Sequence, residues 1–85
     1  MDEASNVLRA LANPRRLAIV RQLKRKQQTV GELVAMLKVS FPATSSHLRI
    51  LRAADLVERS QVGLIVDYRI VDHPTRFVRR ILAII

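Results

Sequence analysis

Apolar side chains recur every three or four residues along much of the chain, which is the spacing of a single helix face. This period predicts a first helix over about residues 4–11. Asn13 followed by Pro14 predicts the start of a second helix, because asparagine caps helices and proline fits their first position. Thr29 and Glu32 have the spacing of a capping box, which predicts the start of a third. Its apolar positions form the clearest period in the chain: Val30, Leu33, Val34 and Leu37.

The stretch SFPATSSHLRILRAADLV, residues 40–57, predicts a fourth helix with two unlike faces. Ser40 can cap it, and Pro42 falls in its first turn, where the missing N–H costs no hydrogen bond. The helix should run to about Ala54, with Asp55 as a left-handed residue after it. At about 100° per residue, the inward arc holds Thr44, Leu48 and Leu51, flanked by His47. The outward arc holds Pro42, Ser45, Ser46 and Arg49, with Phe41 and Arg52 at its edge.

A hairpin and a last helix complete the pattern. Two β-rich segments flank a turn at Gly63, and Val66, Tyr68 and Ile70 alternate on one face, which predicts a hairpin within residues 56–70. His73 and Pro74 predict the start of the last helix, whose apolar band has helical spacing: Phe77, Val78, Ile81, Leu82 and Ile85. The expected fold is therefore mainly α with a small β-hairpin, in the order α-α-α-α-β-β-α. Residues 1–85 are enough for one core, so we expect one domain.

Only the tripeptide KVS separates the third helix from the fourth, which predicts a helix-turn-helix. A hairpin after the second of these helices is the wing of a winged helix-turn-helix, a fold that places that helix in the major groove of DNA. Short side chains allow a close approach, and serine hydroxyls and an arginine suit phosphate oxygens and base edges. A merely solvated polar face is the alternative. The turn, the hairpin and the charge together favour DNA.

The chain has fifteen Lys and Arg against seven Asp and Glu, a formal charge of +8. This excess indicates a polyanionic partner, either nucleic acid or an anionic membrane. There is no cysteine, which excludes disulfides and thiolate metal sites. No apolar run has the length of a membrane span, and the start MDEASNVLRALANP is acidic where a signal peptide is basic. We therefore expect a cytoplasmic protein.

Three segments resemble the ArsR/SmtB family of winged helix-turn-helix repressors: LANPRRLAIVRQL, VGELVAMLKVSFPATSSHLRILRAADLVE and GLIVDYRI. The most specific part of the resemblance is a pattern in and around the fourth helix: Ser40, Pro42, Ala43, Ser45, His47, Leu48, Leu51 and Leu56. The resemblance implies a homodimer that binds a palindromic operator in double-stranded DNA and blocks transcription. It also implies base-reading roles for Phe41, Pro42, Ser45, Ser46 and Arg49. The other candidate DNA contacts are Lys38, Ser40, His47, Arg52, Gln61 and Gly63.

The chain departs from that family's pattern at three places. Phe41 stands where a glutamine is common, so an apolar contact with a thymine methyl replaces a polar base contact there. Asp55 replaces the usual glycine after the fourth helix. The wing tip SQVGL lacks the frequent Arg or Lys, so we expect weaker contacts between the wing and DNA.

Metal sensing in the family uses a Cys-x-Cys before the third helix or carboxylate and His pairs on the last helix. The positions that match the first site are Thr29 and Gly31, which supply no thiolate. The last helix offers only Asp72 and His73, which are adjacent at its start and more commonly cap a helix than bind a metal. We therefore expect no metal site and no cofactor. The carboxylates are scattered and no nucleophile has a base beside it, so we also expect that the protein is not an enzyme.

The apolar surface of the first and last helices exceeds what a small domain buries easily, which predicts an isologous dimer. Its predicted interface is Val7, Leu8, Leu11, Phe77, Val78, Ile81, Leu82 and Ile85. Packing within one chain is the alternative. Two other functions stay open: a winged helix that binds protein partners, and a basic last helix on an anionic membrane. Arg15, Arg16 and Lys38 lie at helix starts and turns, where phosphate contact is the expected role.

Overall fold

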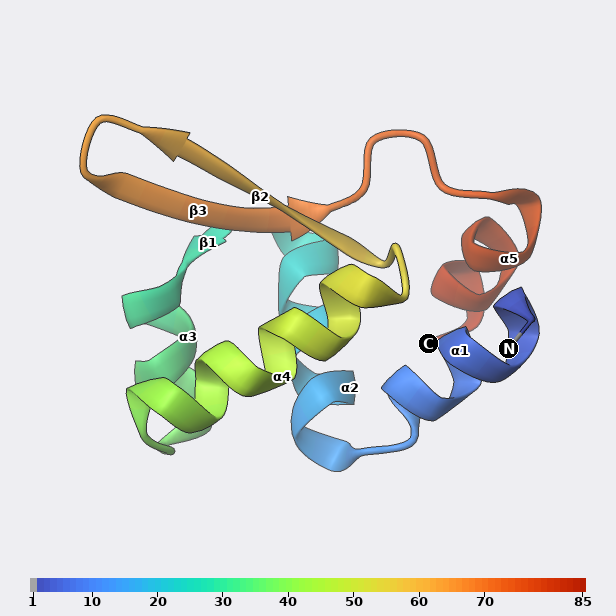
Figure 1. Ribbon diagram of the computed structural model, residues 1–85, viewed down its shortest axis with the longest axis horizontal. Helices are drawn as coiled ribbons and strands as arrows, with labels where there is room; N and C mark the ends of the chain where they lie inside the picture. Colours follow the sequence, from blue (N-terminus) through green and yellow to red (C-terminus); the bar gives the residue numbers. More distant parts are fainter. Residues whose placement is uncertain (1) are drawn as a thin grey trace.

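The computed structural model describes residues 2–85, in a body that measures 33 × 24 × 23 Å (Figure 1). Five helices and three short strands follow one another along the chain: α1 (Glu3–Leu11), α2 (Pro14–Arg25), β1 (Gln28–Thr29), α3 (Val30–Leu37), α4 (Phe41–Ala53), β2 (Val57–Val62), β3 (Ile65–Ile70) and α5 (Arg76–Ile84). The β2–β3 hairpin extends from one end of the body, and α1 and α5 lie at the other end. This order confirms the predicted winged helix-turn-helix architecture.

Polar side chains cap α2 and α3 where the sequence predicted them. The Asn13 side chain accepts hydrogen bonds from the backbone N–H groups of Arg15 and Arg16, at 2.9 and 3.1 Å. Thr29 and Glu32 form the full capping box, in which each side chain accepts from the other residue's backbone N–H. These caps satisfy N–H groups that the first turn of a helix leaves without partners. They fix the starts of α2 and α3.

The last helix begins later than the sequence predicted. His73 and Pro74 precede the helix, and the residue that caps it is Thr75, whose hydroxyl accepts from the backbone N–H of Val78 at 3.2 Å. The expectation that His73-Pro74 starts the helix was therefore wrong. A threonine hydroxyl can accept this hydrogen bond and a proline ring cannot, so the cap decides the boundary.

The sheet has a third strand that the sequence did not reveal. The strand order is β1-β3-β2, and both pairs are antiparallel. In β1, Gln28 lies opposite Tyr68 and Thr29 lies opposite Asp67. A two-residue strand is too short to show a period of two, and the hairpin alone was predicted for this reason. Because β1 pairs with β3 and is followed directly by α3, it connects the wing to the helix-turn-helix.

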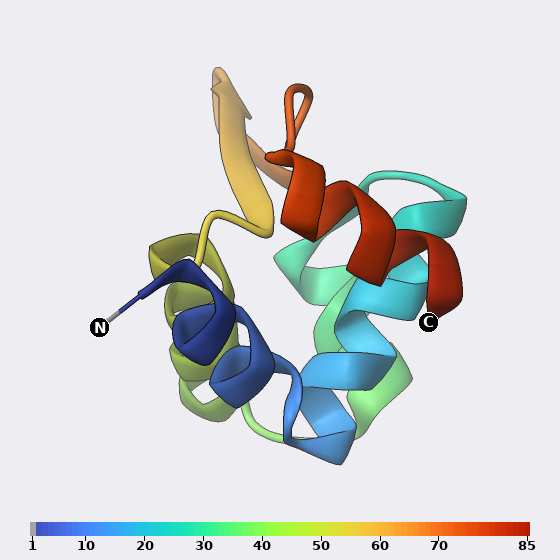
Figure 2. The same cartoon turned by 90° about the vertical axis from the view of Figure 1, so that its right-hand side faces the viewer.

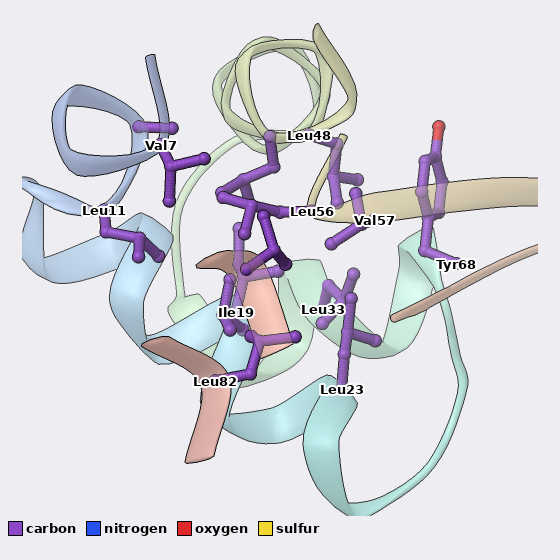
Figure 3. Close-up of a cluster of buried hydrophobic side chains, with 14 residues drawn as sticks. Val7, Leu11, Ile19, Leu23, Leu33, Leu48, Leu56, Val57, Tyr68 and Leu82 are labelled. Atoms are coloured by element: carbon purple, nitrogen blue, oxygen red, sulfur yellow. The ribbon is translucent and has the colours of Figure 1, made fainter. Parts of the chain in front are cut away.

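The core collects apolar side chains from every helix and from the sheet (Figure 3). On α4 the buried residues are Thr44, Leu48 and Leu51, which is the arc that the sequence predicted. Tyr68 comes from the middle of β3, Val57 comes from the start of β2, and Leu56 directly precedes that strand. The left-handed backbone predicted at Asp55 is present, with φ of 57°. It turns the chain from α4 into the wing. Within the described residues no helix is long and apolar enough to cross a membrane.

Candidate nucleic-acid interface

The turn between α3 and α4 is set by local backbone geometry. Lys38 ends α3 in the left-handed conformation, with φ of 58°, and its N–H donates to the Val34 carbonyl at 2.9 Å. The Ser40 hydroxyl then accepts from the N–H of Ala43 at 3.2 Å and so caps α4. Buried Thr44 donates its hydroxyl hydrogen to the Ser40 carbonyl at 3.0 Å. The Ser40 hydroxyl thus positions α4, and Lys38, two residues before Ser40, is exposed.

The face of α4 opposite the core carries the predicted reading residues. Pro42, Arg49 and Arg52 are exposed, and Phe41 keeps 56% of its surface accessible. Ser45 and Ser46 are half-buried, which leaves the helix surface low between Phe41 and Arg49. A low surface flanked by longer side chains can approach the floor of a groove closely. The structure therefore brings these residues together on one side of α4.

An open basic groove of about 480 Å³ joins α4 to the start of the wing. Three arginines line it: Arg49, Arg52 and Arg59. Glu58 also lines it, but its carboxylate accepts a hydrogen bond from Arg69 at 2.9 Å, and Arg69 also contacts Asp72 at 3.3 Å. The groove thus presents mainly positive charge. It is continuous with the reading face through Arg49.

Arg59 is the residue of this groove that the sequence analysis missed. Along β2, Arg59 and Gln61 are exposed, and Glu58 and Ser60, which precede them, are half-buried. Apolar and polar residues do not alternate along VERSQV, residues 57–62, so no period singled out Arg59. What the sequence did not reveal is that the strand starts close enough to α4 for Arg59 to share a groove with Arg49.

The tip of the wing is apolar and internally braced. Arg59 donates to the side-chain oxygen of Gln61 at 3.2 Å, and the Gln61 amide donates to the Gly63 carbonyl at 3.1 Å. Gly63 has φ of 61°, a conformation that glycine adopts freely. Leu64 is fully exposed. Gln61 therefore uses its side chain to hold the turn, and the tip offers no cation of its own.

His47 lies at the edge of the buried face of α4, half-buried, with its Nδ1 atom 3.5 Å from a guanidinium nitrogen of Arg16. Burial lowers the pKa of His47, and the positive charges of Arg16 and Arg15 lower it further. The lowered pKa favours the neutral ring, and in the tautomer that carries its proton on Nε2 the Nδ1 atom accepts a hydrogen bond from Arg16. His47 faces Arg16 on α2 rather than the exposed arc.

The predicted dimer surface divides into two parts. Four of its residues lie in the core of this chain and leave almost no surface for a partner: Val7, Leu11, Val78 and Leu82. The other four keep accessible surface: Leu8, Phe77, Ile81 and Ile85. Ile84, which was not included, is 78% exposed and lies one turn from Ile81 and two from Phe77. Helices α1 and α5 lie on the side of the molecule that faces the viewer in Figure 2, and the wing tip lies at the opposite end in Figure 1.

Over residues 2–85, no three His, Asp or Glu side chains gather closely enough to hold a metal ion. His73 and Asp72 line a hollow next to the start of α5 together with Arg69, and the Asp72 carboxylate contacts that arginine.

The sequence was compared with family models and with known proteins. The model described as "Bacterial regulatory protein, arsR family" matches residues 13–59, from the cap of α2 into the wing. The chain belongs to the ArsR family. The members it matches are transcriptional regulators, which confirms the expectation that this chain is not an enzyme.

Individual relatives within the ArsR family are similar over most of the chain. It is 49% identical over 73 residues to the HTH-type transcriptional repressor SmtB of Mycobacterium tuberculosis. The matched stretch covers 86% of this chain and 54% of that protein. The chain thus spans about half the length of such curated relatives.

Solved structures of the family agree in fold. HlyU from Vibrio cholerae superposes with a TM-score of 0.84 at 33% identity, over 96% of this chain and 86% of that one. A second is the homodimeric winged helix-turn-helix DNA-binding domain Mb0332 from Mycobacterium bovis, described as a possible ArsR-family transcriptional regulator. It gives a TM-score of 0.84 at 30% identity, over 98% of this chain and 74% of that one.

Proposed function

We propose that this protein is a sequence-specific DNA-binding repressor that acts in the cytoplasm as a homodimer on a palindromic operator and does not sense metals. Residues 1–85 form its DNA-binding domain. The observation that carries the proposal is the outward face of α4, where Phe41, Ser45, Ser46 and Arg49 adjoin a groove lined by Arg52 and Arg59. The Mycobacterium tuberculosis relative is named a repressor, and this supports repression as the outcome of binding.

The predicted contacts take different roles in this proposal. Arg49 reads a base edge, since a guanidinium can contact guanine with two hydrogen bonds. Phe41 meets a thymine methyl, and Pro42, Ser45 and Ser46 allow close approach to the bases. Cationic side chains at the rim hold the phosphate backbone and carry no sequence information: Lys38, Arg52 and Arg59. Gln61 and Gly63 shape the wing, and a wing tip without a cation contributes little to the affinity.

Arg49→Ala should reduce discrimination between operator and random DNA by about 1–3 kcal/mol, because it removes a base contact. Operator affinity should fall and random-sequence affinity should change little. The measurement is fluorescence anisotropy with both DNAs across a salt series, on an operator selected from genomic fragments by binding to the wild-type protein.

Lys38→Ala is the matched control, because it also removes one exposed cation near the start of α4. It should lower the affinity for both DNAs by the same factor. The slope of log affinity against log salt concentration should fall by about 1, as expected for a phosphate contact. If Arg49→Ala gives the same pattern as Lys38→Ala, Arg49 is a phosphate contact and the reading face has been assigned wrongly.

Zinc, arsenite and chelators should leave operator affinity unchanged. The family's Cys-x-Cys positions are Thr29 and Gly31 here, and no metal-binding cluster occurs between residues 2 and 85. Titrating each metal into the complex of protein and operator measures the effect directly. A loss of about tenfold at stoichiometric metal, which is the size of an ordinary allosteric coupling, would overturn the metal-independent part of the proposal.

A further inference from the structure

The guanidinium of Arg16 connects three helices. Its Nε atom donates to the Ala10 carbonyl at 2.6 Å, and its Nη2 atom donates to the Arg9 carbonyl at 3.3 Å. Both carbonyls belong to the last turn of α1. Its Nη1 atom lies 3.5 Å from Nδ1 of His47, in the middle of α4. Arg16 itself belongs to the first turn of α2.

The first turn of α2 is an unfavourable place for a cation unless its side chain forms hydrogen bonds elsewhere. The start of a helix carries partial positive charge, so an arginine in the first turn of α2 is unfavourable there. The end of α1 carries partial negative charge and leaves carbonyls without helical partners. The N–H of Ala12 reaches the carbonyls of Leu8 and Arg9 there, and Arg16 reaches that of Ala10. Arg16 therefore caps α1 from α2.

The planar fork of a guanidinium is needed for this arrangement. Its nitrogens point in fixed and different directions, so one side chain can contact two carbonyls of α1 and the ring of His47 together. A lysine ammonium is a single point on a flexible stem and cannot hold both helices in one geometry. The hydrogen bond to His47 also requires a neutral ring, and the lowered pKa of His47 favours that state.

In the proposed dimer, α1 lies beside the partner and α4 lies on the DNA. The angle between these two helices then sets the distance between the two reading helices, which must match about one turn of DNA. We propose that Arg16 is a positioning residue that locks α1 to α4 and thereby sets the spacing of the two half-sites that the dimer accepts. This inference rests on the proposed function. It replaces the role of phosphate contact that the sequence suggested for Arg16.

The test compares three DNAs: the selected operator, the same operator with one base pair added or removed between its half-sites, and a single half-site. Arg16→Lys should bind the operator about tenfold more weakly, a loss similar to that of one base contact. Its affinity for the single half-site should stay near that of the wild-type protein. Its preference for the native spacing over the altered spacings should largely disappear. Sedimentation and thermal unfolding of each variant show whether the dimer and the fold are kept.

Arg15→Lys is the matched control, because Arg15 is the adjacent and exposed arginine. It should keep the spacing preference. His47→Leu removes the contact with α4 and leaves the cap on α1 in place, so it should flatten the spacing preference even if Arg16→Lys does not fold.

Three outcomes would overturn the inference. The first is that Arg16→Lys loses affinity for the operator and for the single half-site by the same factor, which would indicate a phosphate contact. The second is an unchanged spacing preference in folded Arg16→Lys. The third is an unchanged spacing preference in His47→Leu. A wild-type protein that does not distinguish the operator from random DNA would overturn the proposed function and this inference together, which is a separate result from the other three.

Discussion

Replacing Ile84 by glutamate should convert the proposed dimer into monomers and lower operator affinity by at least about a hundredfold, because the gain from binding two linked half-sites is lost. Ile84 is 78% exposed and lies one turn from half-buried Ile81 on α5, a helix on the same side of the molecule as α1. A charge at this position would be buried without a partner when two copies meet, which is strongly unfavourable. The single chain should keep its fold, since Ile84 lies outside the core.

Sedimentation at micromolar concentration and anisotropy on the operator measure the two effects. Leu64→Glu is the control for oligomeric state, because it places the same charge on a fully exposed leucine at the opposite end of the molecule. It should leave the sedimentation unchanged. Leu82 was included in the predicted interface, but it is only 8% exposed and a charge there would damage the core instead. A wild-type protein that is monomeric and still binds the whole operator tightly would contradict the dimer.

The sequence predicted most accurately the elements that are long enough to repeat their own pattern. Helix α4 has thirteen residues, so its apolar arc is sampled several times, and Thr44, Leu48 and Leu51 are buried as expected. The capping box at Thr29 and Glu32 was equally readable because both partners are local. Strand β1 has two residues and no readable period, and its pairing with β3 depends on residues about forty positions away.

The candidate site was predictable residue by residue but not as an assembly. Periodicity placed Arg49 on the outward face of α4, and the family resemblance gave that face a role. The groove that Arg49 shares with Arg59 depends on how the wing packs against α4, which is a tertiary fact. The same holds for Arg16, whose guanidinium reaches backward to α1 and forward to His47, thirty-one residues later. A positive charge in a sequence does not reveal whether it will meet a phosphate or a carbonyl.

The apolar surplus in α1 and α5 shows the same limit. From the sequence, all the apolar residues on one face of α1 and α5 were predicted to lie in the interface. A helical period shows which residues share a face, but it does not show how many of them the core of the same chain buries. The structure divides this predicted interface between the core and the surface: Val78 is fully buried, and Leu8 is 52% exposed. The dimer therefore stays a prediction that depends on the outer edge of the band.

The reading helix is held in place by its buried face, and two adjacent residues allow this to be measured. Leu51 has no accessible surface, and Ile50 beside it on α4 is 40% exposed. Leu51→Ala should lower the free energy of unfolding by about 2–5 kcal/mol, because it removes apolar contacts and leaves a cavity. Ile50→Ala should change it by about 0.5 kcal/mol or less, as is usual for surface positions.

For a domain of this size, a loss of that magnitude is a large part of a total stability of about 5–15 kcal/mol. Leu51→Ala should therefore bind DNA poorly at 37 °C through a loss of folded protein, and cooling or excess operator should restore binding. Urea unfolding followed by circular dichroism, at one fixed protein concentration, gives the two free energies. If both variants lose stability equally, the packing of Leu51 does not anchor α4, and the orientation of the reading face must come from its contacts with the turn and the wing.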